Sequence, residues 1–199
     1  MNYGQIMSYS GRKLIAGVDE AGRGPLAGPV IAAAVILNDE HTIQGLGDSK
    51  KISEKKRNHL AREIKEKSLA WGIGRVEHGE IDEMNILNAS MLAMQKAIHA
   101  LGVVPQHVQV DGNRCPELTC SVEAIVKGDA LISVIGAASI LAKVTRDALM
   151  VEMEKYYPGY GFAKHKGYPT RQHIEALTRL GVCNIHRLSY APVRKLLPR

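Results

Sequence analysis

The sequence of 199 residues is poor in aromatic side chains, cysteines and long apolar runs. It contains one Trp, one Phe and three cysteines, and Cys115, Cys120 and Cys183 form no Cys-x-x-Cys pair. Their odd number and spacing argue against a disulfide framework or a zinc site and favour reduced thiols. No apolar run approaches the roughly 20 residues that cross a bilayer, and residues 1–11 lack the apolar core of a signal peptide. We therefore expect a cytoplasmic protein with no membrane contact, and we take it to be a monomer.

Positive charge is concentrated near the C-terminus. The net charge is +6, and residues 160–199 hold eight Lys or Arg against one acid, whereas the rest of the chain has a slight acidic excess. His165, His173 and His186 lie in the same segment, and we expect His165 to be a surface residue of a basic patch. A concentrated basic surface is typical of a protein that binds a phosphate backbone. Charge alone fits an ordinary solvated face equally well.

The apolar pattern predicts strands first, and then strands alternating with helices. The expected strands cover residues 14–18, 30–37, 70–76, 107–110 and 122–126, and the expected helices cover 53–68, 84–101 and 133–156. This order favours an α/β fold with a mixed β-sheet flanked by helices. The Pro-, Gly- and His-rich segment after Tyr157 indicates a C-terminal helical appendage. We therefore divide the chain into a main domain at 1–157 and a basic helical region at 158–199 packed on it.

Four acidic residues stand at or just beyond the ends of three expected strands. Asp19 and Glu20 follow the first strand, Asp111 follows the strand at 107–110, and Asp129 lies three residues beyond the strand at 122–126. Carboxylates at strand ends can converge at one edge of a sheet. Because like charges repel there, the cluster calls for a hard divalent cation such as Mg²⁺. One or two such ions can drive phosphodiester hydrolysis.

Adjacent positions make Asp19 and Glu20 a special case. Neighbouring residues on a regular strand point to opposite faces of the sheet. Both side chains can reach one site only if the strand ends or bends there, or if Glu20 contributes indirectly.

Several sequence blocks resemble the motifs of ribonuclease HII. The first is Gly17-Val18-Asp19-Glu20-Ala21-Gly22-Arg23-Gly24-Pro25, and the others lie at residues 48–51, 110–113, 127–129, 137–147, 165–170 and 186–187. Any one block is a weak signal, but the series in order is highly specific and covers nearly the whole chain. The resemblance implies an RNase H-like fold, with the catalytic domain at 1–157 followed by the helical region.

The resemblance also implies an activity and a metal. It implies cleavage of RNA in RNA–DNA hybrids and nicking on the 5′ side of single ribonucleotides in duplex DNA, leaving 5′-phosphate and 3′-hydroxyl ends, as in ribonucleotide excision repair. It implies that Asp19, Glu20, Asp111 and Asp129 are the catalytic, metal-binding acids, with Mg²⁺ or Mn²⁺ as the cofactor.

The resemblance also implies substrate contacts. Gly22, Arg23 and Gly24 would sense the 2′-hydroxyl, and Tyr168 would pack on the deoxyribose that follows the ribonucleotide. Glycines suit this role because they let the backbone approach a sugar closely, and the 2′-hydroxyl is what distinguishes RNA from DNA locally. For Tyr168 alone, a packed surface aromatic would be the simpler interpretation.

Lysines near the motifs are candidate phosphate contacts, because ammonium groups act as point charges for phosphate. These candidates are Lys50, Lys51, Lys143 and Lys166. Ser139 and Asp147 lie eight residues apart on one expected helix and could support the site, although Asp147 could equally pair with Lys143.

Three alternatives to a ribonuclease HII are less well supported by the sequence. Ribonuclease HIII carries an extra N-terminal domain, for which we expect no room before the first strand. A nucleic-acid-binding protein without catalysis would not need four acids beside its phosphate surface. A hydrolase with a Ser or Cys nucleophile is not favoured, because the sequence contains no G-x-S-x-G turn.

Overall fold

A mixed five-stranded sheet forms the centre of the protein in the computed structural model, which describes residues 13–197. The strands are β1 (Ile15–Ala21), β2 (Val30–Ile36), β3 (Ala70–Val76), β4 (His107–Asp111) and β5 (Ser121–Ile125). Their order is β3-β2-β1-β4-β5, with antiparallel pairing from β3 to β1 and parallel pairing from β1 to β5. The predicted α/β class and mixed sheet are therefore confirmed.

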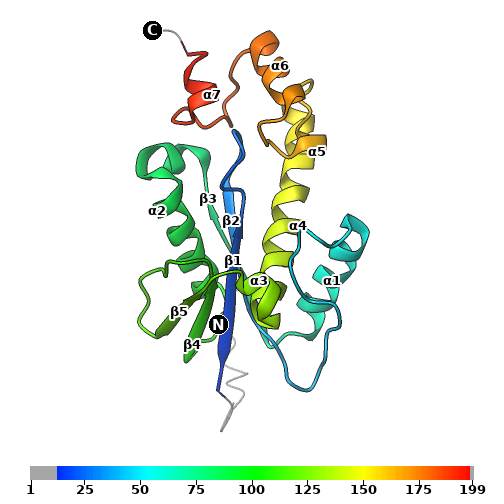
Figure 1. Ribbon diagram of the computed structural model, residues 1–199, viewed down its shortest axis with the longest axis vertical. Coiled ribbons are helices and arrows are strands. Elements are labelled where there is room, and N and C mark those ends of the chain that lie inside the picture. The colour runs from blue at the N-terminus through cyan, green and yellow to red at the C-terminus, as the bar shows by residue number, and fades with distance from the viewer. Residues whose placement is uncertain (1–12, 198–199) are drawn as a thin grey trace, which may run out of the picture.

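Helices cover both faces of this sheet (Figure 1). They are α1 (Glu54–Lys67), α2 (His78–His99), α3 (Gly128–Leu131), α4 (Ser133–Tyr156), α5 (Phe162–His165), α6 (Arg171–Leu180) and α7 (Ala191–Arg194). Helix α2 packs on one face, where Ala16 and Val18 of β1 are buried. Helices α4 and α1 pack on the other face against Ala33 and Val35 of β2. Every residue of β2 is buried because it is covered on both sides, which explains its unbroken apolar sequence.

Gly17 brings α4 unusually close to β1. A Cβ atom at this position would lie 2.3 Å from the carbonyl carbon of Val134, so only glycine fits. The close approach sets the start of α4 directly beside the strand that carries Asp19. A glycine in an apolar strand thus helps to position the site.

Helix α2 begins earlier than the sequence predicted. It starts at His78 and not at residue 84, because Glu77 and Glu80 form a reciprocal capping box. Asn85 interrupts the helix with a positive φ of 69°, and its Oδ1 accepts the N–H groups of Leu87 and Asn88. The predicted start therefore marks the second part of a kinked helix. The apolar pattern missed the first part, which is largely polar.

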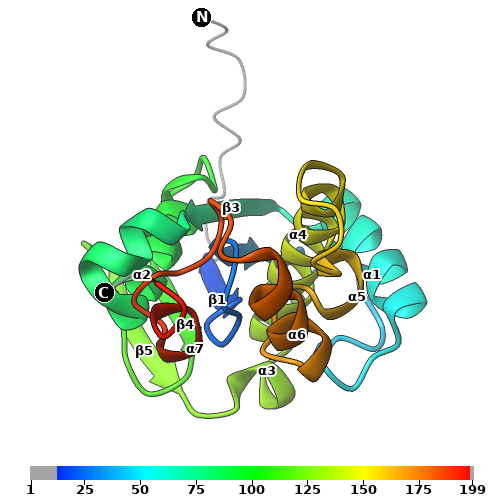
Figure 2. The same ribbon diagram turned by 90° about the horizontal axis from the view of Figure 1, so that it is seen from above.

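The C-terminal segments α5 to α7 lie over one end of the sheet (Figure 2). They share an apolar cluster with Leu26, Ala27 and Met150, formed around Phe162 and Leu177. The predicted boundary after residue 157 falls just beyond the end of α4. The division into two domains stays a prediction.

The expectation of a surface histidine at His165 is wrong. His165 is 8% exposed, His173 is fully buried and His186 is 1% exposed. His165 and His173 contact the Phe162 ring edge-on and His186 contacts it at a tilt, and burial lowers the pKa of His173 and of His186 to about 4. These two rings are therefore neutral at pH 7, and none of the three histidines contributes to a basic surface. Exposed bases remain in this region at Lys164, Arg171, Arg179, Arg194 and Lys195, whereas Arg199 lies outside the described residues.

No helix within residues 13–197 combines the length and the apolar character that a membrane span requires.

Candidate active site

Three carboxylates from three separate segments converge at one edge of the sheet. Val18 of β1 pairs with Val110 of the parallel strand β4, so the next residues, Asp19 and Asp111, are lateral neighbours. Asp129 joins them from the start of α3, and its backbone N–H donates to Asp111 Oδ1 at 3.3 Å. One carboxylate oxygen from each residue lies within 4.8 Å of the other two. The structure thus brings together three of the four predicted acids.

Glu20 occupies a different position from these three. Strand β1 runs on through Ala21, so alternation projects Glu20 from the side that carries Ala16 and Val18. It lies outside the three-carboxylate group but lines the same cavity. Its Oε1 pairs with Arg23 at 3.3 Å, while its Oε2 is buried without a hydrogen-bond partner within the described chain. The role of Glu20 as a metal ligand stays a prediction.

The electrostatics of this edge disfavour ionised acids. Burial, reinforced by the charges of Glu20 and Asp111, raises the pKa of Asp19 well above its usual value. Burial also raises the pKa of Glu20, against the opposing effect of Arg23. Burial and then Asp111 raise the pKa of Asp129. No ion pair within residues 13–197 neutralises Asp19, Asp111 or Asp129.

This donor set fits a divalent cation. Hard oxygen ligands converge, their charge is uncompensated, and one buried oxygen of Glu20 lacks a partner among the described residues. A cation would remove the repulsion that raises these pKa values. The chemistry of the residues therefore agrees with a Mg²⁺-type or Mn²⁺-type site.

Two buried serines support Asp19. The Ser139 hydroxyl donates a hydrogen bond to the Asp19 carboxylate, which opposes the rise in its pKa. Ser139 Oγ also lies 2.9 Å from Ser49 Oγ. The loop that carries Ser49 is fixed in turn by Arg57, whose Nη1 donates to the Ser49 carbonyl at 2.9 Å. Sequence reasoning had suggested support from Ser139 but had overlooked Ser49 and Arg57.

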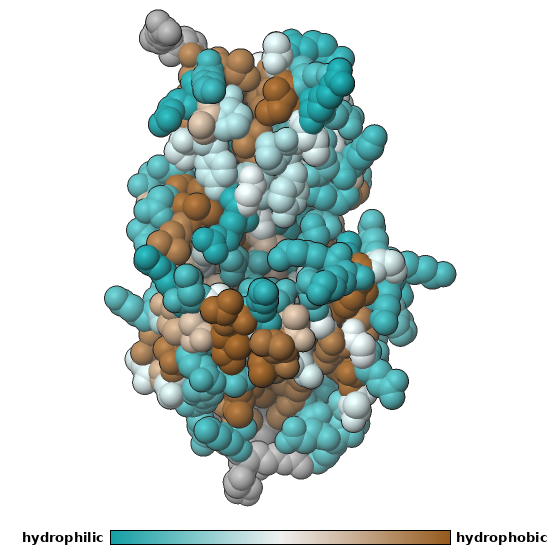
Figure 3. All heavy atoms as spheres, viewed as in Figure 1, coloured by the Kyte–Doolittle hydropathy of each residue, from teal (hydrophilic) through white to brown (hydrophobic). Residues whose placement is uncertain are grey.

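The acidic edge opens into a cavity of about 530 Å³. Gly22, Arg23, Gly24 and Tyr168, the predicted substrate contacts, line this cavity together with Asp19, Glu20 and Asp111, and their role in binding stays a prediction. Gly22 has a φ of +102°, and a Cβ atom there would lie 2.1 Å from Arg146 Nε, so no other residue fits. The Tyr168 ring is 38% exposed and faces Gly24. Hydrophilic side chains gather across the middle of the molecular face in Figure 3.

Only two of the four predicted lysines line this cavity. Lys50 and Lys143 belong to its wall. Lys143 Nζ pairs with Asp147 at 2.8 Å and lies 5.6 Å from the centre of the Tyr168 ring. Lys51 is 3.7 Å from Asp48, with a side chain that is 80% exposed. Lys166 donates to the Ala163 carbonyl and faces a separate groove between α1 and α4.

Two buried arginines behind the glycine loop were missed by the sequence analysis. Arg146 is 1% exposed and donates to the carbonyls of Ala27 and Pro29. Arg187 is fully buried and donates to the carbonyls of Gly22 and Gly28. Burial, assisted by the charge of Arg187, lowers the pKa of Arg146 to about 10. Their only sequence signal was their place in the blocks at 137–147 and 186–187.

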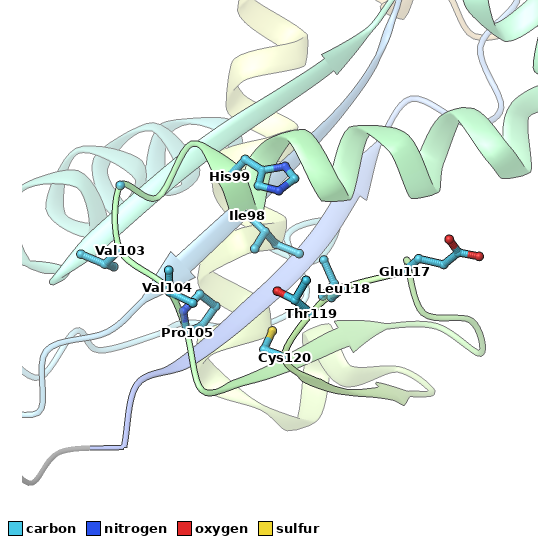
Figure 4. A pocket seen from close by; sticks show the side chains of 10 residues that line it. Ile98, His99, Val103, Val104, Pro105, Glu117, Leu118, Thr119 and Cys120 are labelled. Carbon is cyan, nitrogen blue, oxygen red and sulfur yellow. The ribbon is translucent and has the colours of Figure 1, made fainter.

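A larger cavity of about 670 Å³ lies at the C-terminal end of α2 (Figure 4). It is lined by apolar side chains such as Ile98, Val103 and Leu118, and Glu117 is the one acid among its described lining residues. It lacks the convergent carboxylates that metal-assisted chemistry requires. We therefore place the chemistry in the smaller acidic cavity.

Solved structures similar to this chain include ribonucleases H of type 2. Ribonuclease H2 from Pyrococcus horikoshii OT3 is 28% identical with a TM-score of 0.76, and the match covers 92% of this chain and 96% of that one. RNase HII from Archaeoglobus fulgidus, solved in a complex with PCNA, is 26% identical with a TM-score of 0.75, covering 89% and 95%. A mutant of Bst-RNase HIII is 19% identical with a TM-score of 0.73, covering 92% and 68%, and shows the shared fold.

A family model supplies the final evidence. The RNase H-like fold implied by the sequence motifs is confirmed by these structural matches. The model of ribonuclease HII matches residues 16–193, which is most of the chain. The match extends from the first strand, through all the acids described above, to the last short helix. The chain belongs to the ribonuclease HII family and is a ribonuclease H endonuclease.

Proposed function

We propose that this enzyme hydrolyses the RNA strand of RNA–DNA hybrids and nicks duplex DNA on the 5′ side of a single embedded ribonucleotide. The products would carry 5′-phosphate and 3′-hydroxyl ends, and Mg²⁺ or Mn²⁺ would be the cofactor. One observation carries the proposal. Asp19 and Asp111, two of the three convergent carboxylates, line the same cavity as a glycine loop and an aromatic ring, so a group of acids suited to a metal and a surface suited to a sugar share one cavity.

Asp19, Asp111 and Asp129 would hold the cation, with the free oxygen of Glu20 available beside them. When bound, Mg²⁺ or Mn²⁺ supplies activation of the attacking water and stabilisation of the charge on the phosphate. The Ser139 hydroxyl orients Asp19 through its hydrogen bond. A structure of Bst-RNase HIII in complex with Mn²⁺, which is 18% identical, is consistent with this choice of ion.

The glycine loop and Tyr168 in the same cavity would select the substrate. Gly22, Arg23 and Gly24 would contact the 2′-hydroxyl, and the exposed Tyr168 ring would pack on the next deoxyribose. A site built to hydrogen-bond a hydroxyl can reject the analogue that lacks it by roughly 10⁴-fold. Lys50 and Lys143 would contact phosphates, whereas Lys51 and Lys166 are placed for weaker roles outside the cavity.

The test uses a DNA duplex with one ribonucleotide, incubated with Mg²⁺, with Mn²⁺ or with EDTA. We expect one nick on the 5′ side of the ribonucleotide, with the stated ends, in either metal and none in EDTA. An all-DNA duplex of the same sequence is the control. Cleavage that persists in EDTA would refute the metal mechanism, and a cut elsewhere would refute the junction specificity.

A nucleic-acid-binding protein without catalysis is the alternative. The variant Asp111→Asn separates the two, because it removes one carboxylate from the metal group and leaves the glycine loop and Tyr168 in place. We expect this variant to bind the substrate without cutting it. Near-normal cutting would remove Asp111 from the active site, and absence of cutting by the unmodified protein would favour the alternative.

A cytoplasmic monomer that acts in ribonucleotide excision repair is part of the same proposal. Free thiols at Cys115, Cys120 and Cys183 support a reducing compartment. The repair role follows from the proposed junction substrate.

A further inference from the structure

The carbonyl groups of the glycine loop point away from the cavity and into a buried guanidinium. Arg187 Nη2 donates to the Gly22 carbonyl at 2.6 Å, and Arg187 Nη1 donates to the Arg23 carbonyl at 3.0 Å. Arg187 Nε and Nη2 both donate to the Gly28 carbonyl, at 3.0 and 2.9 Å. One planar side chain therefore fixes both ends of the turn that connects β1 to β2.

Tyr190 completes the same arrangement. Its hydroxyl accepts from Arg187 Nη1 at 2.9 Å and donates to the Arg23 carbonyl at 2.6 Å. The Arg187 guanidinium carbon also lies 5.1 Å from the centre of the Tyr190 ring. We call Arg187 and Tyr190, with these three carbonyl groups, the carbonyl clamp.

The orientation of the carbonyls fixes the orientation of the neighbouring N–H groups. In a trans peptide the C=O and N–H bonds point in opposite directions, and no cis peptide occurs in the described chain. The Gly22 carbonyl shares its peptide with the Arg23 N–H, and the Arg23 carbonyl shares its peptide with the Gly24 N–H. Both N–H groups are therefore turned away from Arg187, in a loop that lines the cavity. Within residues 13–197, neither donates a hydrogen bond to another protein group.

Burying the guanidinium of the clamp costs free energy of folding. Arg187 is fully buried, and within the described part of the chain no carboxylate forms an ion pair with it. Burial lowers its pKa, and its charge also disfavours the buried Arg146 nearby. The charge of Asp82 opposes this fall in the pKa of Arg187, but Asp82 forms no ion pair with it. A buried cation without an ion-paired carboxylate costs free energy that an apolar side chain of similar volume would avoid. Such a cost is expected where a backbone must be held in one orientation for function.

We propose that Arg187 and Tyr190 are positioning residues that set the selectivity of the enzyme for a ribonucleotide. They hold the Gly22–Arg23 and Arg23–Gly24 peptides so that two N–H donors face the sugar-phosphate of the substrate. The charged clamp also polarises both peptides, which makes these N–H groups stronger donors. The inference rests on the proposed function, in which this loop recognises the 2′-hydroxyl.

The test measures discrimination in binding, with cleavage removed by Asp111→Asn. In this background and in Mg²⁺, the dissociation constant is measured for a duplex with one ribonucleotide and for the all-DNA duplex of the same sequence. The ratio of the two constants reports 2′-hydroxyl recognition. We expect Arg187→Lys to reduce the ratio at least tenfold, because an ammonium cannot reproduce the planar fork that reaches three carbonyls. Tyr190→Phe, which removes one hydroxyl, should reduce it about fivefold.

A matched control separates positioning from general support. Asp82 of α2 accepts the backbone N–H groups of Leu188 and Ser189, so it holds the segment that carries the clamp without touching the glycine loop. Asp82→Ala should lower the melting temperature and leave the binding ratio within about twofold. Unchanged ratios in Arg187→Lys and Tyr190→Phe, with melting temperatures lowered as in Asp82→Ala, would overturn the proposal.

Two further outcomes are decisive. If Arg187→Lys does not fold, the milder Tyr190→Phe decides, because a normal ratio in that variant overturns the role of the clamp. If the Asp111→Asn parent itself binds both duplexes equally, the proposed recognition of a ribonucleotide is wrong, and the inference falls with it. A parent that discriminates, together with clamp variants that discriminate equally well, refutes only the inference.

Discussion

Two groups of buried or partly buried charged side chains lie near the glycine loop, and their charges are satisfied in different ways. The carboxylates of Asp19, Asp111 and Asp129 converge at the sheet edge, and the guanidiniums of Arg146 and Arg187 lie behind the loop. No ion pair within residues 13–197 involves any of the five. Burial raises the pKa of Asp19 and lowers that of Arg146, so each group resists its charged form.

The difference lies in the partners. Backbone carbonyls of the loop satisfy the arginines, because a guanidinium offers five donors in a plane and carbonyls are abundant in a turn. The acids have few donors around them, and Glu20 keeps one oxygen with no partner in the described chain. The protein itself therefore completes the cationic group, whereas the acidic group has no compensating ion pair within the described chain. The first group supports the loop, and in the proposed function the second binds the metal.

The largest effect should come from removing one acid. Asp129→Asn should lower the single-turnover rate of hybrid cleavage by about a thousandfold or more, because a bound cation contributes several kcal/mol of stabilisation to the transition state. Glu123→Gln is the control, since Glu123 is an acid on β5 outside the cavity, and its rate should be unchanged. Near-normal cleavage by Asp129→Asn would exclude this residue from the site.

Removing a buried arginine should have a large effect on stability. Arg146→Met leaves the carbonyls of Ala27, Pro29 and Lys166 without their buried donor. The free energy of unfolding in urea should fall by about 3 kcal/mol. Arg171→Met, at a side chain that is 93% exposed, should change it by less than about 0.5 kcal/mol. An Arg146 variant as stable as the unmodified protein would show that the carbonyls do not need the cation.

In the metal-free protein, replacing a buried acid should raise the stability and not lower it. Since the folded-state pKa of Asp19 is raised, its favourable contribution is present at low pH and is lost as the pH rises through that value. Asp19→Asn avoids this loss, so in EDTA at pH 8 it should melt a few degrees above the unmodified protein, given roughly 2–4 °C per kcal/mol. The difference should vanish near pH 4.

The comparison of Asp19→Asn with the unmodified protein has two further controls. The buried His173 and His186 have lowered pKa values, so they cost stability as the pH falls, but they do so in both proteins and cancel. Saturating Mg²⁺ or Mn²⁺ should reverse the order at pH 8, because it binds the unmodified site more tightly. Lower stability of Asp19→Asn in EDTA at pH 8 would contradict the account of an unsatisfied acidic group.

The smallest effect should separate two adjacent lysines. Lys50 lines the cavity, whereas Lys51 lies outside it with an 80% exposed side chain. Lys50→Ala should weaken hybrid binding several-fold and reduce the slope of log K against log salt by about 0.9, the value for one lost phosphate contact. Lys51→Ala should leave the slope nearly unchanged. Equal slopes for the two variants would mean that both lysines contact a phosphate or that neither does. Either result would contradict the expected difference between them.

The sequence predicted the acids and most elements because their signals are local. Alternating and continuous apolar runs mark the strands, and Ser53, the first residue of the expected helix at 53–68, caps α1. Prediction from the sequence failed where the burial of a side chain depends on segments that are distant in the chain. His165 and His173 looked like members of a basic patch, yet packing around the single Phe buries them. Helix α2 began earlier than predicted because a capping box, and not an apolar residue, starts it.

By itself the sequence placed four acids at or near the ends of expected strands, because residue type and strand periodicity are local properties, and its resemblance to ribonuclease HII implied roles for the glycine loop and Tyr168. Only the tertiary structure decided how they are used. It placed Asp19 with Asp111 and Asp129, and set Glu20 on the other side of β1. It also brought Arg187 from the far end of the chain to the Gly22 carbonyl. Such contacts depend on strand register and on packing between distant segments, which no local pattern encodes.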